Sequence, residues 1–157
     1  SATGTAIVEV KTVQGEFVAE CAITVVDREI SVDLTPEFTW TPGSITYANG
    51  VASSQYAKDW LYSNRVEVGS YDTITFTHIQ TTNTATPLGY AFYDRNSKYI
   101  TGASNGGGTY ETTIKTINVP DNAKYFSVMW MNTTHSRYNA DKYGLTENFF
   151  CYGNFVA

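Results

Sequence analysis

Leucine is scarce in this chain, and so are cysteine and histidine. Only four leucines occur in 157 residues, and the apolar content of 42% is carried mainly by Val, Ile, Tyr and Phe. Sequences rich in β-branched and aromatic residues favour strands over helices. No stretch keeps a helical period, and 52–61 is the only segment of helical length. The composition therefore predicts an all-β fold.

Long apolar runs and clusters of positive charge are also missing. No run approaches the roughly 18 apolar residues of a membrane-spanning helix, so we expect no membrane insertion. The ten Lys and Arg residues are scattered singly in a chain of net charge −5. Binding to nucleic acid requires a basic stripe or patch, and we therefore expect no nucleic-acid partner.

The residues that catalysis usually needs are few. There are two cysteines and two histidines, with no Cys–His neighbourhood and no spacing typical of a zinc site. His78 lies in a threonine-rich strand, where we expect a structural role. Cys21 and Cys151 lie in apolar alternating runs near opposite ends of the chain; buried free thiols are expected, with a bridge between them as the alternative. We therefore expect no enzymatic activity in this chain.

Cofactor signals are equally sparse. The run Gly106–Gly108 lacks the lysine and the helix that follow a phosphate-binding loop, so it is interpreted as a hairpin loop. We expect no cofactor. A structural calcium ion remains an alternative because acidic and amide residues occur in the loops, namely Asp94, Asn96, Asp121 and Asn122.

Apolar residues alternate with others on both sides of Gln14–Gly15, which predicts a β-hairpin over 6–26. The hairpin resembles the last two strands of a bacterial immunoglobulin-like domain of group 2. The resemblance is carried by Gly4-Thr5-Ala6, Val8, Val10, Gly15, Phe17, Ala19, Cys21 and Ile23-Thr24-Val25. It implies that 1–27 is the C-terminal part of such a domain, which needs about 80–100 residues to close its sandwich.

A connector over 28–36, with room for one short strand, leads to the main domain over 37–157. Many short strands separated by turn residues predict an antiparallel, jelly-roll-like β-sandwich. Alternation places Ile74 and Phe76, and likewise Phe126, Val128 and Trp130, in the core. The expected strands are 37–41, 45–47, 64–68, 71–79, 87–94, 98–100, 110–119, 124–132 and 148–156.

Aromatic residues make up 15% of the chain, more than a domain of this size can bury. Exposed rings pack against the apolar faces of sugars, while neighbouring polar groups bind the hydroxyls. Trp60 is the tryptophan least explained by strand alternation, so we expect it to be exposed; a lid over the core is the alternative. The predicted ligand-binding residues come from two segments: Asp59, Trp60, Tyr62, Asn64 and Arg65, and His135, Arg137 and Tyr138. The second segment is expected to form the opposite wall of a groove.

From Phe38 onward the order of features is similar to a β-sandwich module of extracellular bacterial polysaccharide-degrading proteins and of phage tail and receptor-binding proteins. The matching residues are Trp40, Gly43-Ser44-Ile45, Gly50, Arg65–Val68, Ala91–Asp94, Ser97–Ile100, Val119-Pro120 and Ala123–Tyr125. Similar modules often carry a basic residue where this chain has Ser127.

This resemblance implies a non-catalytic carbohydrate-binding module, extracellular or on the cell surface, that binds polysaccharide or oligosaccharide and is linked to catalytic or surface domains. The positive charge of Arg65 is compatible with an acidic or sulfated sugar. The alternative is an adhesion or phage-type receptor-binding domain.

Overall fold

In the computed structural model the chain divides into two units, Ser1–Ile30 with Val156–Ala157, and Ser31–Phe155. The structure describes residues 4–11, 18–25, 28–46, 49–80, 88–104, 106 and 110–156. The expected turn at Gln14–Gly15, the end of the expected strand 45–47, and Gly107 and Gly108 lie outside these residues. In the described part of the chain no helix is long and apolar enough to cross a membrane.

The predicted N-terminal hairpin is present. Strands β1 (Gly4–Lys11) and β2 (Val18–Val25) pair antiparallel. The register places Ala6 opposite Ile23 and Val8 opposite Cys21. This pairing confirms the hairpin that the sequence predicts.

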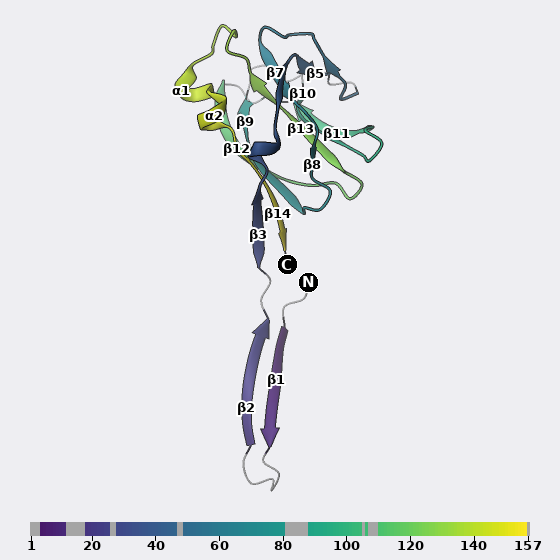
Figure 1. Cartoon of the computed structure of the whole chain (residues 1–157), viewed down its shortest axis with the longest axis vertical. Coiled ribbons are helices and arrows are strands. Elements are labelled where there is room, and N and C mark those ends of the chain that lie inside the picture. Colours follow the sequence, from purple (N-terminus) through teal and green to yellow (C-terminus); the bar gives the residue numbers. More distant parts are fainter. Residues whose placement is uncertain are drawn as a thin grey trace. The chain divides into compact units, whose positions relative to one another are not determined.

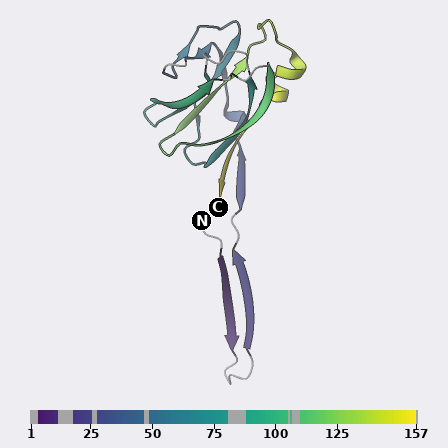
Figure 2. The same ribbon diagram turned by 180° about the vertical axis from the view of Figure 1, so that it is seen from behind.

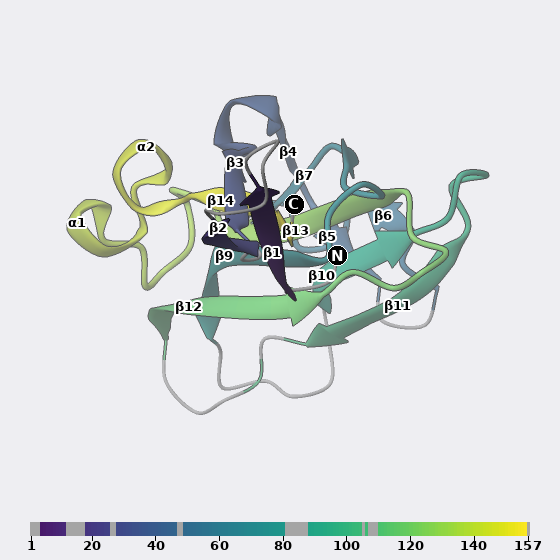
Figure 3. The same ribbon diagram turned by 90° about the horizontal axis from the view of Figure 1, so that it is seen from below.

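The second unit is an antiparallel sandwich-like arrangement of two sheets, which confirms the all-β prediction (Figure 1). The larger sheet has the order β4-β7-β13-β10-β5-β6, with β11 paired to β10 (Figure 3) and β8 paired to β13. Its strands are β4 (Trp40–Pro42), β5 (Ser44–Ile45), β6 (Ala52–Ser53), β7 (Trp60–Ser63), β8 (Val66–Glu67), β10 (Leu88–Tyr93), β11 (Tyr99–Ser104) and β13 (Tyr125–Met131).

The smaller sheet has the order β12-β9-β14-β3. A chain of side-chain hydrogen bonds crosses its four strands: Ser31 donates to Asn154, Asn154 donates to Thr75, and the Thr75 and Thr116 hydroxyls lie 2.9 Å apart. These bonds connect neighbouring strands on one face of the sheet. The strands are β3 (Glu29–Asp33), β9 (Thr73–Gln80), β12 (Glu111–Asn118) and β14 (Cys151–Val156).

The core lies between the two sheets. Phe76 of the smaller sheet contacts Phe126 and Tyr90 of the larger sheet, with ring centroids 5.0 and 5.5 Å apart. A second aromatic group joins Trp130 and Trp40 to Phe149, at 5.5 and 5.0 Å. Complete burial of one such ring stabilises the fold by about 1.5–3 kcal/mol. The alternation in β9 and β13 therefore identified the core face correctly.

The opposite face of β13 is buried as well, which alternation did not predict. Ser127, Met129 and Met131 are at most 2% exposed. The backbone N–H of Ile45 donates to Met129 Sδ at 3.4 Å, so β5 covers this face. Ser127, where similar modules often carry a basic residue, instead donates a hydrogen bond to the carbonyl of Ser63. A charged side chain would lack solvent at this position.

Gly43 makes this second buried layer possible. It is the single residue between β4 and β5. β4 pairs with β7 on one side of β13, and β5 pairs with β10 on the other side. Its φ is +142°, and a Cβ atom there would lie 2.3 Å from the Ser53 carbonyl oxygen. Only glycine fits this crossing, because both the backbone angle and the space exclude a side chain.

Several expected boundaries differ from the structure. The segment 52–61 is not a helix: it holds β6, turns over 54–59 and the start of β7. The expected strand 37–41 begins as the 3-10 helix η1 (Thr35–Glu37), and 64–68 shortens to β8. Two short helices were not predicted, α1 (Ala140–Tyr143) and α2 (Leu145–Asn148), which lie close to each other in the second unit (Figures 1 and 2).

Candidate functional site

The first group of predicted site residues is spread along β13 instead of forming one surface. Trp60 pairs with Met131 at the end of β13, whereas Val66, which follows Arg65, pairs with Phe126 near its start. Five residues of extended chain span about 16 Å. Trp60 and Arg65 therefore lie toward opposite ends of β13 and cannot both contact one sugar ring.

Trp60 is buried, contrary to the expectation that it is exposed. Its exposed fraction is 7%, and it belongs to the core cluster. The backbone N–H of Trp60 donates to the carbonyl of Tyr56, and its carbonyl accepts from Gly43. The indole contacts the imidazole of His135, with ring centroids 5.5 Å apart. Trp60 thus acts as the lid over the core that was the alternative interpretation.

The two predicted segments do meet, at the end of β13. The backbone N–H of Asn132 donates to the carbonyl of Asp59 at 2.9 Å, and the Asn132 side chain donates to the carbonyl of Ala57 at 2.7 Å. The Thr134 hydroxyl donates to the carbonyl of Lys58. The loop after β13 is therefore attached to the turn before β7, which places Asp59, Trp60 and His135 in one neighbourhood.

His135 is held between two aromatic rings. Its imidazole lies 5.5 Å from the Trp60 ring and 5.4 Å from the Tyr110 ring, centroid to centroid. Nδ1 accepts the backbone N–H of Arg137 at 3.0 Å, which leaves Nε2 to carry the proton in the neutral ring. Burial lowers the pKa of His135; nearby Asp59 raises it and Arg137 lowers it. The site therefore favours a neutral histidine.

Arg137 and Tyr138 follow in the same loop. The Arg137 guanidinium lies 4.7 Å from the centroid of the Tyr110 ring, a cation–π contact. Tyr138 is partly buried against the core. The Tyr143 hydroxyl donates to the carbonyl of Tyr110 at 2.5 Å, and the Trp130 indole N–H donates to the carbonyl of Tyr143 at 2.7 Å. The loop and α1 are thus anchored to the core.

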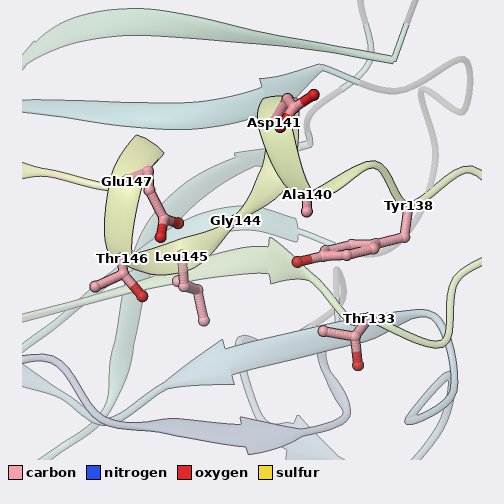
Figure 4. Close-up of a pocket in the computed structure, with 8 residues that line it drawn as sticks. All are labelled: Thr133, Tyr138, Ala140, Asp141, Gly144, Leu145, Thr146 and Glu147. Carbon is pink, nitrogen blue, oxygen red and sulfur yellow. The ribbon is translucent and has the colours of Figure 1, made fainter.

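A cavity of about 630 Å³ lies between this loop and the two short helices. Figure 4 shows the Tyr138 hydroxyl pointing toward the Gly144–Leu145 segment. Glu147 turns toward the same segment: a Cβ atom on Gly144 would lie 2.5 Å from Glu147 Oε2. The wall therefore combines an aromatic face with hydroxyl and carboxylate oxygens. The lining residues are Thr133, Tyr138, Ala140, Asp141, Gly144, Leu145, Thr146 and Glu147.

The other predicted residues make local structural contacts. Asn64 bridges the chain before β4, since its Oδ1 accepts from Thr39 N–H and its Nδ2 donates to the carbonyl of Glu37. Tyr62 is half-buried and its ring packs against Gly43. Arg65 is exposed and lies over the ring of Tyr93. These three lie outside the cavity lining.

The other residues that the sequence offers for catalysis or metal binding have structural roles. His78 is buried, and its Nε2 lies 2.7 Å from the Thr113 hydroxyl. Cys151 is a buried free thiol, as expected, and burial raises its pKa; the Cys21 side chain lies outside the described part. Asp94 Oδ1 already accepts the backbone N–H groups of Asn96 and Lys98. Among the described residues no group of three or more His, Cys, Asp or Glu is arranged to hold a metal ion.

Comparisons with protein-family models, curated proteins and solved structures give no match.

The sequence pattern identified Tyr138 but neither Tyr110 nor the helices that form one wall of the cavity. A local signal for α1 was present: Asn139 Oδ1 accepts the backbone N–H of Asp141 at 2.9 Å, a typical N-cap.

Proposed function

We propose that this chain is a non-catalytic carbohydrate-binding module whose binding surface is the cavity between the loop 132–139 and helices α1 and α2. The observation that carries the proposal is the lining of this cavity. It presents one aromatic ring, Tyr138, beside the hydroxyl groups of Thr133 and Thr146 and the carboxylate of Glu147. A pyranose needs this combination: an apolar surface for its C–H face and polar oxygens for its hydroxyls.

Support for a preformed site comes from the anchoring of the loop. The loop is hydrogen-bonded to the turn 54–59, and His135 is packed between Trp60 and Tyr110. A rigid site loses little conformational entropy on binding. Affinity is still expected to be weak, with Kd on the order of micromolar to millimolar, because a single open surface removes little apolar area from water.

The arrangement of the two carboxylates of the lining supports the non-catalytic part of the proposal. Hydrolysis of a glycosidic bond requires a pair of carboxyl groups that face each other across the substrate. In Figure 4 the Asp141 side chain projects away from the Tyr138 ring, whereas Glu147 folds over Gly144. These directions support binding of a glycan over its hydrolysis.

The proposed setting is a secreted or surface protein of bacterial type, in which the β1–β2 hairpin is part of an immunoglobulin-like spacer and other domains supply any enzymatic activity. Linkage to such domains would raise the apparent affinity through avidity.

The test is affinity electrophoresis against a panel of neutral and acidic polysaccharides. We expect wild type to be retarded by at least one of them, Tyr138→Ala to lose most of the retardation, and Tyr138→Phe to keep part of it. Tyr152→Ala is the matched control, because Tyr152 is 36% exposed on β14 and does not line the cavity. Retention of full binding by Tyr138→Ala would place the binding surface elsewhere. The absence of binding to any glycan would favour an adhesion or receptor-binding domain.

A further inference from the structure

Arg65 is an exposed cation whose position is fixed by the fold. Its guanidinium carbon lies 3.9 Å from the centroid of the Tyr93 ring, and its Nη1 donates to the Ser97 carbonyl at 3.0 Å. Tyr93 is itself buried, and its hydroxyl donates to the Gly50 carbonyl at 2.6 Å. The ring therefore provides a rigid platform that orients the guanidinium plane.

Most of the hydrogen-bonding capacity of Arg65 is unused. A guanidinium has five N–H donors, and among the described residues the acceptors that it contacts are the Ser97 carbonyl and the Tyr93 hydroxyl. No carboxylate in the described part of the chain pairs with Arg65; the neighbouring carboxylate on β8, Glu67, is bound to Lys124 instead. An oriented guanidinium with a free edge is the group that proteins use to bind carboxylates and sulfates in a bidentate manner.

The turn that contacts Arg65 adds further positive charge. It joins β10 to β11 and carries Arg95 and Lys98, both exposed. The one acidic residue of this turn, Asp94, directs Oδ1 to two backbone N–H groups and so shapes the turn itself. Ser97 has a φ of +65°, a conformation that non-glycine residues seldom adopt, and in that conformation its carbonyl accepts the Arg65 bond. Arg65 and the turn that it contacts thus carry three cations and one carboxylate, in a chain whose net charge is −5.

We propose that Arg65, with Arg95 and Lys98, forms an anion-binding subsite for the carboxylate or sulfate groups of an acidic polysaccharide. This inference rests on the proposed function for the polysaccharide, but the anion site itself does not depend on it. The site lies near the start of β13, about 20 Å along the strand from the loop that forms the Tyr138 cavity. The two sites therefore recognise different parts of a chain of sugars.

Two probes distinguish the sources of the anionic group: polygalacturonate, which carries carboxylates, and dextran sulfate. We expect Arg65→Gln to weaken binding of the preferred probe at least tenfold, and Arg65→Lys to weaken it by an intermediate factor because the planar fork is lost while the charge remains. Arg28→Gln is the matched control: it removes the same charge from an exposed residue of the first unit and is expected to bind as wild type does. Thermal unfolding verifies that each variant is folded.

A second measurement separates this inference from the proposed function. Sodium sulfate is titrated into ¹⁵N-labelled protein, and the Nε–H resonance of Arg65 is followed by NMR, with Arg65→Lys providing its assignment. A saturable shift of this resonance, with that of Arg28 unchanged, supports the subsite even where no polysaccharide binds. Equal binding of acidic probes by wild type and Arg65→Gln, or a shift that grows linearly and equally for both arginines, overturns it.

Discussion

Replacement of Trp60 distinguishes its role in the core from a role in ligand binding. The side chain is 7% exposed and contacts His135 on one side and the core cluster on the other. Truncation of a buried tryptophan to alanine costs about 3–5 kcal/mol, through lost burial and the cavity that remains. For a domain of this size, about 2–4 °C of Tm corresponds to each kcal/mol, so Trp60→Ala is expected to lower Tm by roughly 6–20 °C.

The assay is urea unfolding monitored by circular dichroism, together with a thermal scan. Tyr56→Ala is the control from the same segment; because Tyr56 is 46% exposed, its truncation is expected to change stability by about 0.5 kcal/mol or less. If Trp60→Ala lowers the free energy of unfolding by less than about 1 kcal/mol and also impairs glycan binding, the core assignment is refuted. The hypothesis that Trp60 is an exposed ligand-binding residue would then be restored.

Three further predictions concern buried polar and titratable groups. Asn154→Ala is expected to destabilise the protein by about 1–3 kcal/mol in urea unfolding, because its amide connects three strands and its loss leaves partners unpaired. The pKa of His135 is lowered in the native state, so its contribution to stability is present above about pH 6.5 and is lost as pH falls below that value; Tm measured from pH 8 to 5 should fall less for His135→Asn than for wild type, and parallel curves would contradict this. Cys151 is fully buried and its pKa is raised, so alkylation by iodoacetamide, located by peptide mapping, should be slow in the native protein and rapid in urea; rapid native labelling would contradict its burial.

The regular strands could be predicted because their sequences record their environment. On one face of β9 and of β13, every second residue is apolar, and these side chains form the interface between the sheets: Ile74, Phe76, Phe126, Val128 and Trp130. Alternation identifies the more apolar face of a strand, and it does so most readily in long strands. The boundaries of β9, β10, β12 and β13 accordingly agree with the expected ranges within two residues at either end.

The environment of Trp60 could not be read from its neighbours. Lys58 and Asp59 precede it and Asn64 follows it, which is typical of a surface loop. The four residues between Asp59 and Asn64 nevertheless form β7, which pairs with β13. What buries the indole is the loop around His135, more than 70 residues later in the chain. Such a contact depends on tertiary topology and has no local sequence signature.

The helices α1 and α2 were missed for a different reason. Each has four residues, little more than one turn, and a period of 3.6 residues cannot be recognised over so short a stretch. Their position depends on anchors elsewhere: the Trp130 indole, which donates to the Tyr143 carbonyl, and the Tyr110 carbonyl, which accepts the Tyr143 hydroxyl. The cavity they form was therefore beyond the reach of pattern analysis, although Tyr138 was identified.

The two buried serines at the contact between β7 and β13, Ser63 and Ser127, have a mechanical consequence. Ser63 Oγ donates to the Asn64 carbonyl and accepts the backbone N–H of Val128, while the Ser127 hydroxyl donates to the Ser63 carbonyl. A shift of β7 by one residue would break the two bonds that cross to β13 and leave polar groups without partners in the interior. The two serines therefore fix the register of β7 against β13. Trp60 begins β7 and Arg65 follows two residues after Ser63, so a slip of this segment would displace the contact with the His135 loop and the Arg65 guanidinium together.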